Sequence, residues 1–249
     1  MRVLPSSLAV LALCFAATAA AQTSLTRTEV AALKAKLVTV QQAMGADPAG
    51  YLKESEDFDL PTDANPAQGG KFWPITSGIT LRYTDRGSAE GQANAEQAMA
   101  DFQAKYAAAI ASGNAEAMQK MVTELQQIQA AAMAPPVKKD DMNVYVQFNQ
   151  NPTVGIDPDA VVLEQAGVIA LREKEVSSEK GNVTVYIDPV ALKATQELSK
   201  IELRTAQDGV SNKTGVFHIV IQLNGAVADA EAWVKDFDLS AMLGVIDPQ

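Results

Sequence analysis

The chain contains a single histidine, His218, and histidine is the side chain that most often serves as a general base near neutral pH. It lies in an alternating stretch, with Val216, Val220 and Gln222 expected on the same face of a strand. A histidine base needs an orienting acid and a nucleophile beside it in space. Because one unclustered histidine lacks these partners, we expect a structural or surface role for His218.

Metal and cofactor sites are not indicated by the residue types. Zinc sites use cysteine and histidine, and the chain has one of each. The two acids of Asp157–Asp159 do not resemble a calcium loop, because a proline separates them and the glycine turn of such loops is missing. Helix capping explains Asp157 better. Neither a Walker-type loop nor a G-x-G-x-x-G motif occurs, so we expect no metal and no cofactor.

Two fragments match motifs of penicillin-binding proteins and β-lactamases, in which a serine is the nucleophile. Ser177–Lys180 has the S-x-x-K pattern, and Lys213–Gly215 has the K-T-G pattern. In that family S-x-x-K opens a helix, so that serine and lysine share a face, whereas residues 177–181 are typical of a hairpin turn. An S-D-N element is also missing, and we therefore reject the match. The sequence identifies no catalytic residue.

The densest acidic run is Glu54–Asp63, with the sequence ESEDFDLPTD. Charge runs usually face water, so the run is interpreted as part of a solvated loop over residues 46–74. Paired carboxylates can nevertheless hydrolyse glycosidic bonds without a recognisable motif. Acids are plentiful in this chain and nothing singles out one pair, so a hydrolase remains an alternative without named residues.

Residues 1–21 have the three parts of a secretory signal peptide. Arg2 supplies the positive start, Leu8–Ala17 is an apolar run, and Ala19–Ala21 supplies small residues before Gln22. The apolar run is too short to span a membrane. We therefore expect an exported protein, periplasmic or secreted, and the alanine-rich signal is typical of bacteria.

Removal of this segment takes away the only cysteine, Cys14, together with one arginine and no acid. The remaining chain has 19 basic and 30 acidic residues, which gives a formal net charge of −11. This balance disfavours nucleic acid and anionic lipid as partners, because both are bound mainly by lysine and arginine. No later segment is apolar enough to be an integral membrane segment.

The region 22–134 is mainly helical in pattern. Thr26 and Glu29 have the spacing of a capping box, and apolar residues follow at helical intervals (Val30, Leu33, Leu37, Val40 and Met44). After a short strand at 79–84, two long helices are predicted from about 88 to 111 and from 114 to 133. Because Gly113 and Asn114 leave only a short turn, we expect an antiparallel helix hairpin over 88–133.

Residues 135–141 are interpreted as a linker, after which the apolar period changes from 3.6 to 2. The region 142–249 is predicted to be an α+β domain. Its expected strands lie at 142–148, 168–174, 182–187, 200–205 and 215–223, and its expected helical stretches lie at about 158–166, 189–199 and 226–236.

A weak internal repeat supports this division. Ile156–Pro158 and Ile187–Pro189 share the tripeptide Ile-Asp-Pro, and each is followed by a helical stretch and a strand; Ile246–Pro248 repeats it near the chain end. Aspartate caps a helix start, and proline is tolerated at the first helical position. Two such copies give the order βαββαβ, which is that of a ferredoxin-like arrangement.

The sequence thus predicts an α+β fold. A helical region with the hairpin at 88–133 precedes an antiparallel sheet with helices on one face, ferredoxin-like with an added strand and helix. In the absence of a catalytic constellation, we expect a non-catalytic binding or interaction protein of the bacterial envelope, with a protein or small-molecule partner. The hairpin and the sheet face bearing His218 are the expected contact surfaces. The alternatives are a hydrolase with a carboxylate or serine site and a structural subunit of an envelope assembly.

Overall fold

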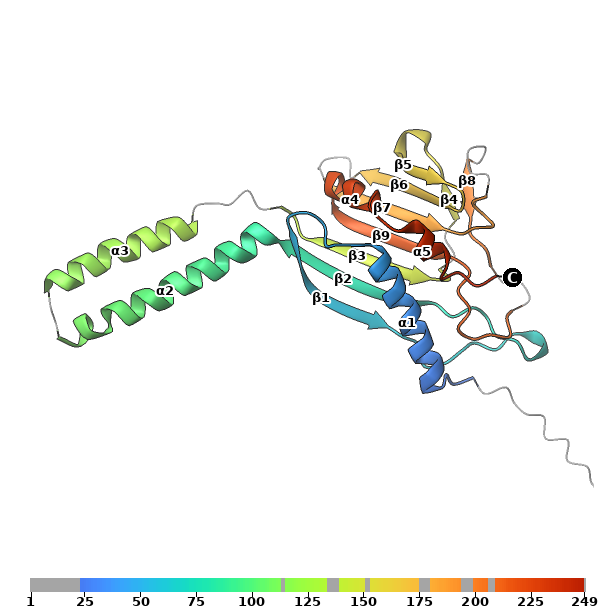
Figure 1. The fold of residues 1–249 in the computed structure, drawn as a ribbon, viewed down its shortest axis with the longest axis horizontal. Helices are drawn as coiled ribbons and strands as arrows, with labels where there is room; N and C mark the ends of the chain where they lie inside the picture. The colour runs from blue at the N-terminus through green and yellow to red at the C-terminus, as the bar shows by residue number, and fades with distance from the viewer. Residues whose placement is uncertain are drawn as a thin grey trace, which may run out of the picture.

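A computed structural model describes residues 23–112, 115–133, 139–150, 153–174, 180–193, 199–205 and 209–248. Its centre is a seven-stranded antiparallel sheet in the order β1-β2-β3-β9-β7-β6-β5 (Figure 1). The strands are β1 (Tyr51–Asp59), β2 (Ser77–Asp85), β3 (Met142–Phe148), β5 (Val161–Gln165), β6 (Val168–Lys174), β7 (Lys180–Ile187) and β9 (Ile219–Ala226). Strands β4 (Thr153–Gly155) and β8 (Lys200–Glu202) form a second, two-stranded sheet.

Five α-helices accompany the sheets within the described residues. They are α1 (Arg27–Ala43), α2 (Arg86–Ser112), α3 (Ala115–Met133), α4 (Val227–Val234) and α5 (Leu239–Leu243). Short 3-10 helices lie at η1 (Gln68–Gly70) and η2 (Pro158–Ala160). Helix α1 begins with the predicted capping box, which is confirmed: the Glu29 amide donates to Thr26 Oγ1 at 3.2 Å, and the Thr26 amide donates to Glu29 Oε2 at 2.7 Å.

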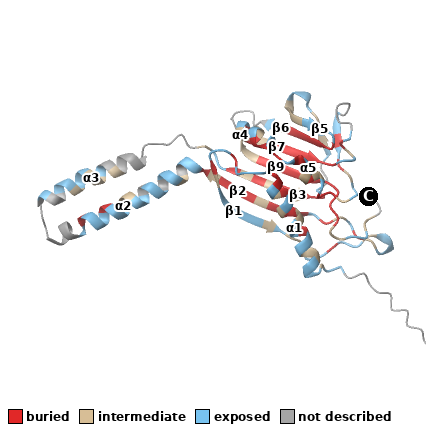
Figure 2. Cartoon of the chain, in the orientation of Figure 1, coloured by how far each residue is buried: buried red, intermediate tan, exposed pale blue. Residues whose placement is uncertain are grey.

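The main core lies between one face of the large sheet and helices α1, α4 and α5 (Figure 2). Side chains along a strand alternate between the two faces, so every second residue points to this core. Strand β3 follows the rule, because its fully buried residues alternate with half-buried ones (Met142, Val144, Val146 and Phe148 are buried). Burial of this alternating apolar set determines the register of the central strands.

The opposite face of the sheet is covered in part. A smaller apolar cluster joins β6, β7 and β9 to the segments around β8 (Ile169, Leu171, Tyr186, Val220, Leu192, Ile201 and Leu203). Toward β1 the same face carries half-buried polar residues in adjacent strands, such as Thr80, Tyr145 and Gln222. An antiparallel sheet commonly has one packed and one solvated face, and this sheet is packed on one side and mixed on the other.

Helices α2 and α3 lie side by side and project from one end of the sheet (Figure 1). Between them, Lys105 Nζ lies 2.7 Å from Glu124 Oε2, and the Tyr106 hydroxyl donates to the same carboxylate at 2.7 Å. The rings of Phe102 and Tyr106 are buried and 5.0 Å apart. Most other described side chains of the pair are exposed (Figure 2).

The predicted fold class is wrong. The molecule is mostly a large antiparallel sheet of seven strands with a two-stranded sheet and five helices, and it is not a helical half built around a long helix hairpin followed by a ferredoxin-like half. Strand β2 precedes the two long helices and β3 follows them, yet the two strands pair directly, with Ser77 opposite Phe148. Strands from both parts of the sequence therefore share one sheet.

The ferredoxin-like order fails at the expected crossover helices. Residues 158–165 form η2 and strand β5, and the described residues 189–193 form turns. Strands β6 and β7 are antiparallel neighbours, as the expected order requires, but β9 inserts between β7 and β3. The prediction failed because an Asp-Pro cap fits a turn or a 3-10 helix as well as an α-helix.

The acidic stretch was also assigned wrongly in part. Residues 46–74 were expected to form a loop, but residues 51–59 form strand β1. Its side chains from Lys53 to Asp57 are exposed, as a solvated run requires.

The expected helix at 226–236 is confirmed by α4. The signal segment 1–21, Ser177 and residues 135–138 of the expected linker lie outside the described residues.

Candidate functional site

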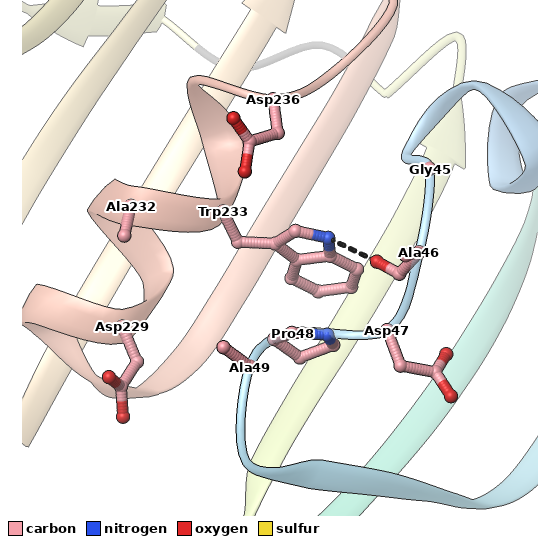
Figure 3. Close-up of a pocket in the computed structure, with 9 residues that line it drawn as sticks. All are labelled: Gly45, Ala46, Asp47, Pro48, Ala49, Asp229, Ala232, Trp233 and Asp236. Atoms are coloured by element: carbon pink, nitrogen blue, oxygen red, sulfur yellow. Dashed lines mark hydrogen bonds between the residues drawn. The ribbon is translucent and has the colours of Figure 1, made fainter.

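A cleft of about 220 Å³ lies between the turn after α1 and the outer side of α4 (Figure 3). The turn contributes Gly45–Ala49, and α4 with its C-terminal end contributes Asp229, Ala232, Trp233 and Asp236. The volume is below the range of about 300–1,000 Å³ that is usual for drug-sized ligands. The cleft therefore has room for one side chain or a similarly small group.

The turn owes its shape to two glycines. Helix α1 ends at Ala43 with Met44 as its C-cap, and Gly45 has a φ of 80°, in the left-handed region that favours glycine after a helix. Gly50 has a φ of 84° immediately before β1. Pro48 is buried between them and contributes an apolar wall to the cleft.

Trp233 closes one side of the cleft. Its indole Nε1–H donates to the carbonyl of Ala46 at 2.9 Å, so the ring joins α4 to the turn (Figure 3). Behind it, the rings of Tyr83 and Phe237 lie 5.3 and 5.4 Å away in edge-to-face arrangements. These contacts hold the indole in one orientation, because aromatic pairs of this geometry are favourable.

A polar junction adjoins the cleft and involves Asp229. Its carboxylate accepts a hydrogen bond from the Tyr51 hydroxyl at 3.0 Å and lies 3.2 Å from Lys139 Nζ. Burial, followed by the hydrogen bond to Asp229, raises the pKa of Tyr51 well above its usual range. Tyr51 therefore remains a protonated donor at any physiological pH.

The same junction connects the chain segments that flank α2 and α3 to the turn. Lys139 Nζ lies 3.4 Å from the Ala49 carbonyl, and the Arg86 amide donates to the Gly50 carbonyl at 2.9 Å. Arg86 begins α2, and Lys139 lies a few residues after α3. Both chain segments that lead to the helix pair are thus hydrogen-bonded to the turn that lines the cleft.

The cleft combines carboxylates with apolar walls. Three of its nine lining residues are aspartates, and the others are alanine, glycine, proline and tryptophan. None of the nine has a hydroxyl, thiol or imidazole that could act as a nucleophile or a histidine base. Asp47 and Asp236 are exposed at the rim, while Asp229 is already paired with Lys139. Carboxylates beside an apolar wall favour a cationic group with an alkyl stem.

His218 does not line this cleft. It is 1 % exposed, and its Nε2 contacts the carbonyl of Gln150, while Nδ1 is buried with no hydrogen-bond partner. Burial lowers the pKa of His218, although the hydrogen bond to the Gln150 carbonyl and then the charge of Asp188 oppose the shift. The ring is therefore neutral at pH 7 and packed into the interior, which excludes the surface role that the sequence also allowed.

The three Ile-Asp-Pro motifs have separate tasks. Asp157 caps η2 by accepting from the Asp159 amide at 3.0 Å, which confirms the capping interpretation. Asp188 is fully buried, accepts from the amides of Val190 and Ala191, and forms an ion pair with Arg204 at 2.8 Å. Asp247 lies 2.5 Å from Lys36 Nζ.

The remaining sequence candidates are structural or lie outside the described residues. Lys213 of the K-T-G fragment donates to the Ser24 carbonyl at 3.2 Å and lies over the Phe72 ring. In the part of the chain that the structure describes, no three histidine, cysteine or acidic side chains gather as metal ligands. No described helix is long and apolar enough to cross a membrane.

Sequence reasoning missed the cleft because its residues are far apart along the chain. The turn at 45–49, Lys139 and Asp229 come together only when α4 packs on the sheet near the start of β1. One signal was present, since Gly45, Pro48 and Gly50 mark a tight turn between helix and strand.

Comparison with family models, with curated proteins and with solved structures finds no match for the chain.

Proposed function

We propose that the protein is an exported, non-catalytic binding protein whose cleft receives a lysine or arginine side chain of a protein partner. The observation that carries the proposal is the combination of apolar walls and carboxylates in a space of about 220 Å³. The apolar walls suit the methylene stem of such a side chain, and the rim acids suit its charged end.

The charge of the whole chain supports a basic partner. The formal net charge of the full sequence is −10, and long-range attraction raises the association rate of oppositely charged proteins. The chain segments that flank α2 and α3 are hydrogen-bonded beside the cleft, so this projecting pair offers further exposed surface to the same partner. Export rests on the signal-like residues 1–21.

The test uses small probes on residues 22–249 labelled with ¹⁵N. Butylammonium copies the lysine side chain, and butanol is a neutral molecule of the same shape. We expect butylammonium, but not butanol, to shift the amide signals of the turn 45–49 and the indole signal of Trp233. Comparison with a Trp73→Phe variant assigns the two indole signals.

The double variant Asp47→Asn/Asp236→Asn removes the two rim charges with little change of shape. Two partly exposed ion pairs of roughly 0.5–1 kcal/mol each correspond to a loss of about 5- to 30-fold in affinity. Glu90→Gln/Glu164→Gln makes the same change of net charge elsewhere and serves as the control. Equal affinities for the amine and the alcohol, or equal losses in the two double variants, would contradict the proposal.

A further inference from the structure

Strand β1 forms one edge of the seven-stranded sheet, and its outer side carries backbone groups without a neighbouring strand. It pairs with β2 on one side, and no described residue pairs with its other side. From Ser55 to Asp59 the register with β2 is regular, which makes a straight edge of five residues. At about 3.3 Å per residue this edge is roughly 17 Å long, enough to pair with a short extended peptide.

The side chains on this edge are unusually acidic. Between Lys53 and Asp59 lie four acids and one lysine, and Lys53 is already paired with Glu56 at 2.9 Å. Glu56 also accepts from Gln41 of α1, so its charge is engaged on the covered face. The exposed carboxylates of Glu54, Asp57 and Asp59 remain for a partner.

Edge strands are often protected by charge so that they do not pair with one another. The acidic side chains of β1 disfavour pairing with a second acidic strand and favour pairing with a basic one. A second copy of β1 would bring carboxylates opposite carboxylates, and like charges directly opposite each other destabilise a strand pair. A strand with lysine or arginine at alternate positions would place its charges beside Asp57 and Asp59, which are two residues apart and point to one face.

The opposite edge of the sheet offers no equivalent surface. Strand β5 has five residues, its register with β6 is broken between Val161 and Leu163, and these apolar residues are half-buried. Continuous backbone pairing is therefore available at β1 and is interrupted at β5.

We propose that the β1 edge binds a basic extended segment of a partner by adding it to the sheet as an eighth strand. The open backbone of residues 55–59 supplies the hydrogen bonds, and the alternating carboxylates select a positively charged sequence. This inference uses a different surface from the cleft and stands or fails independently of it.

The experiment titrates ¹⁵N-labelled residues 22–249 with a short peptide that alternates lysine and valine. A second peptide has the same side chains and charge but carries an N-methyl group on every backbone nitrogen, so that neither of its edges can pair with β1. A third replaces lysine by glutamate. We expect the first peptide to slow amide hydrogen exchange in residues 53–59, while the second and third leave it unchanged.

Asp57→Asn/Asp59→Asn should weaken binding of the first peptide about fivefold, the factor that two cross-strand ion pairs of ordinary strength supply. Glu90→Gln/Glu164→Gln makes the same change of net charge away from β1 and the cleft and is the matched control, and we expect it to bind this peptide with unchanged affinity. The inference is overturned if the N-methylated peptide binds as tightly as the parent, which indicates charge attraction alone, or if no protection appears in β1. Absence of binding at millimolar peptide overturns it as well.

Discussion

At the scale of single residues, the surroundings of a carboxylate determine its task more than its sequence motif does. Asp157 and Asp188 stand in the same Ile-Asp-Pro tripeptide and both accept backbone amides of the following turn. Asp157 does so at the surface, whereas Asp188 is fully buried and is also paired with Arg204, whose side chain is 9 % exposed. Arg204 in turn donates to the Phe217 carbonyl at 2.6 Å, which links the turn to the segment before β9.

Asp188→Ala should destabilise the protein far more than Asp157→Ala. Loss of one member of a buried ion pair leaves the other charge uncompensated and costs about 3–5 kcal/mol. Loss of an exposed cap costs about 0.5–1 kcal/mol. Urea unfolding of both variants measures the two free energies of unfolding, and similar losses would show that the buried pair contributes little beyond its capping bonds.

His218 should make the protein less stable as the pH falls below 6.5. Burial lowers the pKa of His218 in the folded state, so the unfolded chain binds a proton more readily than the folded one. Stability is therefore complete above the unfolded pKa near 6.5 and declines, by at most about 1.4 kcal/mol per pH unit, until the folded pKa is reached. Below the folded pKa both states bind the proton, so His218 causes no further loss of stability.

The imidazole signals of a protein without an added histidine tag report this titration directly, because the chain has one histidine. We expect a midpoint below 6.5 and, in His218→Gln, a weaker pH dependence of the urea midpoint just below pH 6.5. A midpoint at or above 6.5 would contradict the account of the buried neutral ring.

At the scale of elements, the projecting helices are an insertion between two strands that pair directly. Tyr83 lies opposite Met142, and the hydroxyl of Thr84 donates to Asp141 at 3.2 Å. The two ends of the insertion are therefore as close as the two strands of a β-hairpin, and the register of β2 and β3 continues to the pair Tyr83–Met142, three residues before α2 begins.

Replacement of residues 85–140 by Asn-Gly should leave the sheet folded. A two-residue Asn-Gly turn joins adjacent antiparallel strands without strain. The replacement removes the last β1–β2 pair, Tyr51 with Asp85, and the hydrogen bond from the Arg86 amide to the Gly50 carbonyl. It also removes the partly exposed pair of Lys139 with Asp229, worth about 0–1 kcal/mol. Cooperative thermal unfolding and an unchanged pattern of amide signals from β3, β7 and β9 would support this. A chain that no longer unfolds cooperatively would show that the helices are needed for the fold.

Elements were predictable from the sequence wherever a local pattern had one outcome. The capping box at Thr26 and the alternation in β3 gave the right helix and strand, because each pattern specifies both an element and a buried face. Strand β1 was missed because charge runs usually indicate loops, and this strand lies at the sheet edge with most of its side chains in water. The Ile-Asp-Pro motifs predict helices where the structure has turns, because capping residues mark a turn without specifying its length.

At the scale of the whole molecule, the order of strands explains why neither the fold nor the cleft followed from the sequence. Strand β9 pairs with β3 and β7, so the last strand of the chain lies at the centre of the sheet. Local patterns carry no information on such long-range pairing. The cleft depends on it in turn, since α4 follows β9 and brings Trp233 to the turn at Ala46.

The same arrangement distributes the acidic surface. The cleft and the β1 edge are formed by consecutive stretches, residues 45–49 and 51–59, and both present carboxylates to solvent. A chain with a formal net charge of −10 repels copies of itself and attracts basic partners, most strongly at low ionic strength. We therefore propose recognition of a basic partner for the molecule as a whole.

The most direct test of that claim is a nuclear Overhauser measurement between Trp233 and Nα-acetyl-lysine methylamide added at millimolar concentration. We expect contacts between the methylene protons of this probe and the indole of Trp233, and their loss in Asp47→Asn/Asp236→Asn. If the contacts are absent, or if they persist unchanged in the variant without the two rim charges, the cleft does not bind a cationic side chain and the proposed function is wrong.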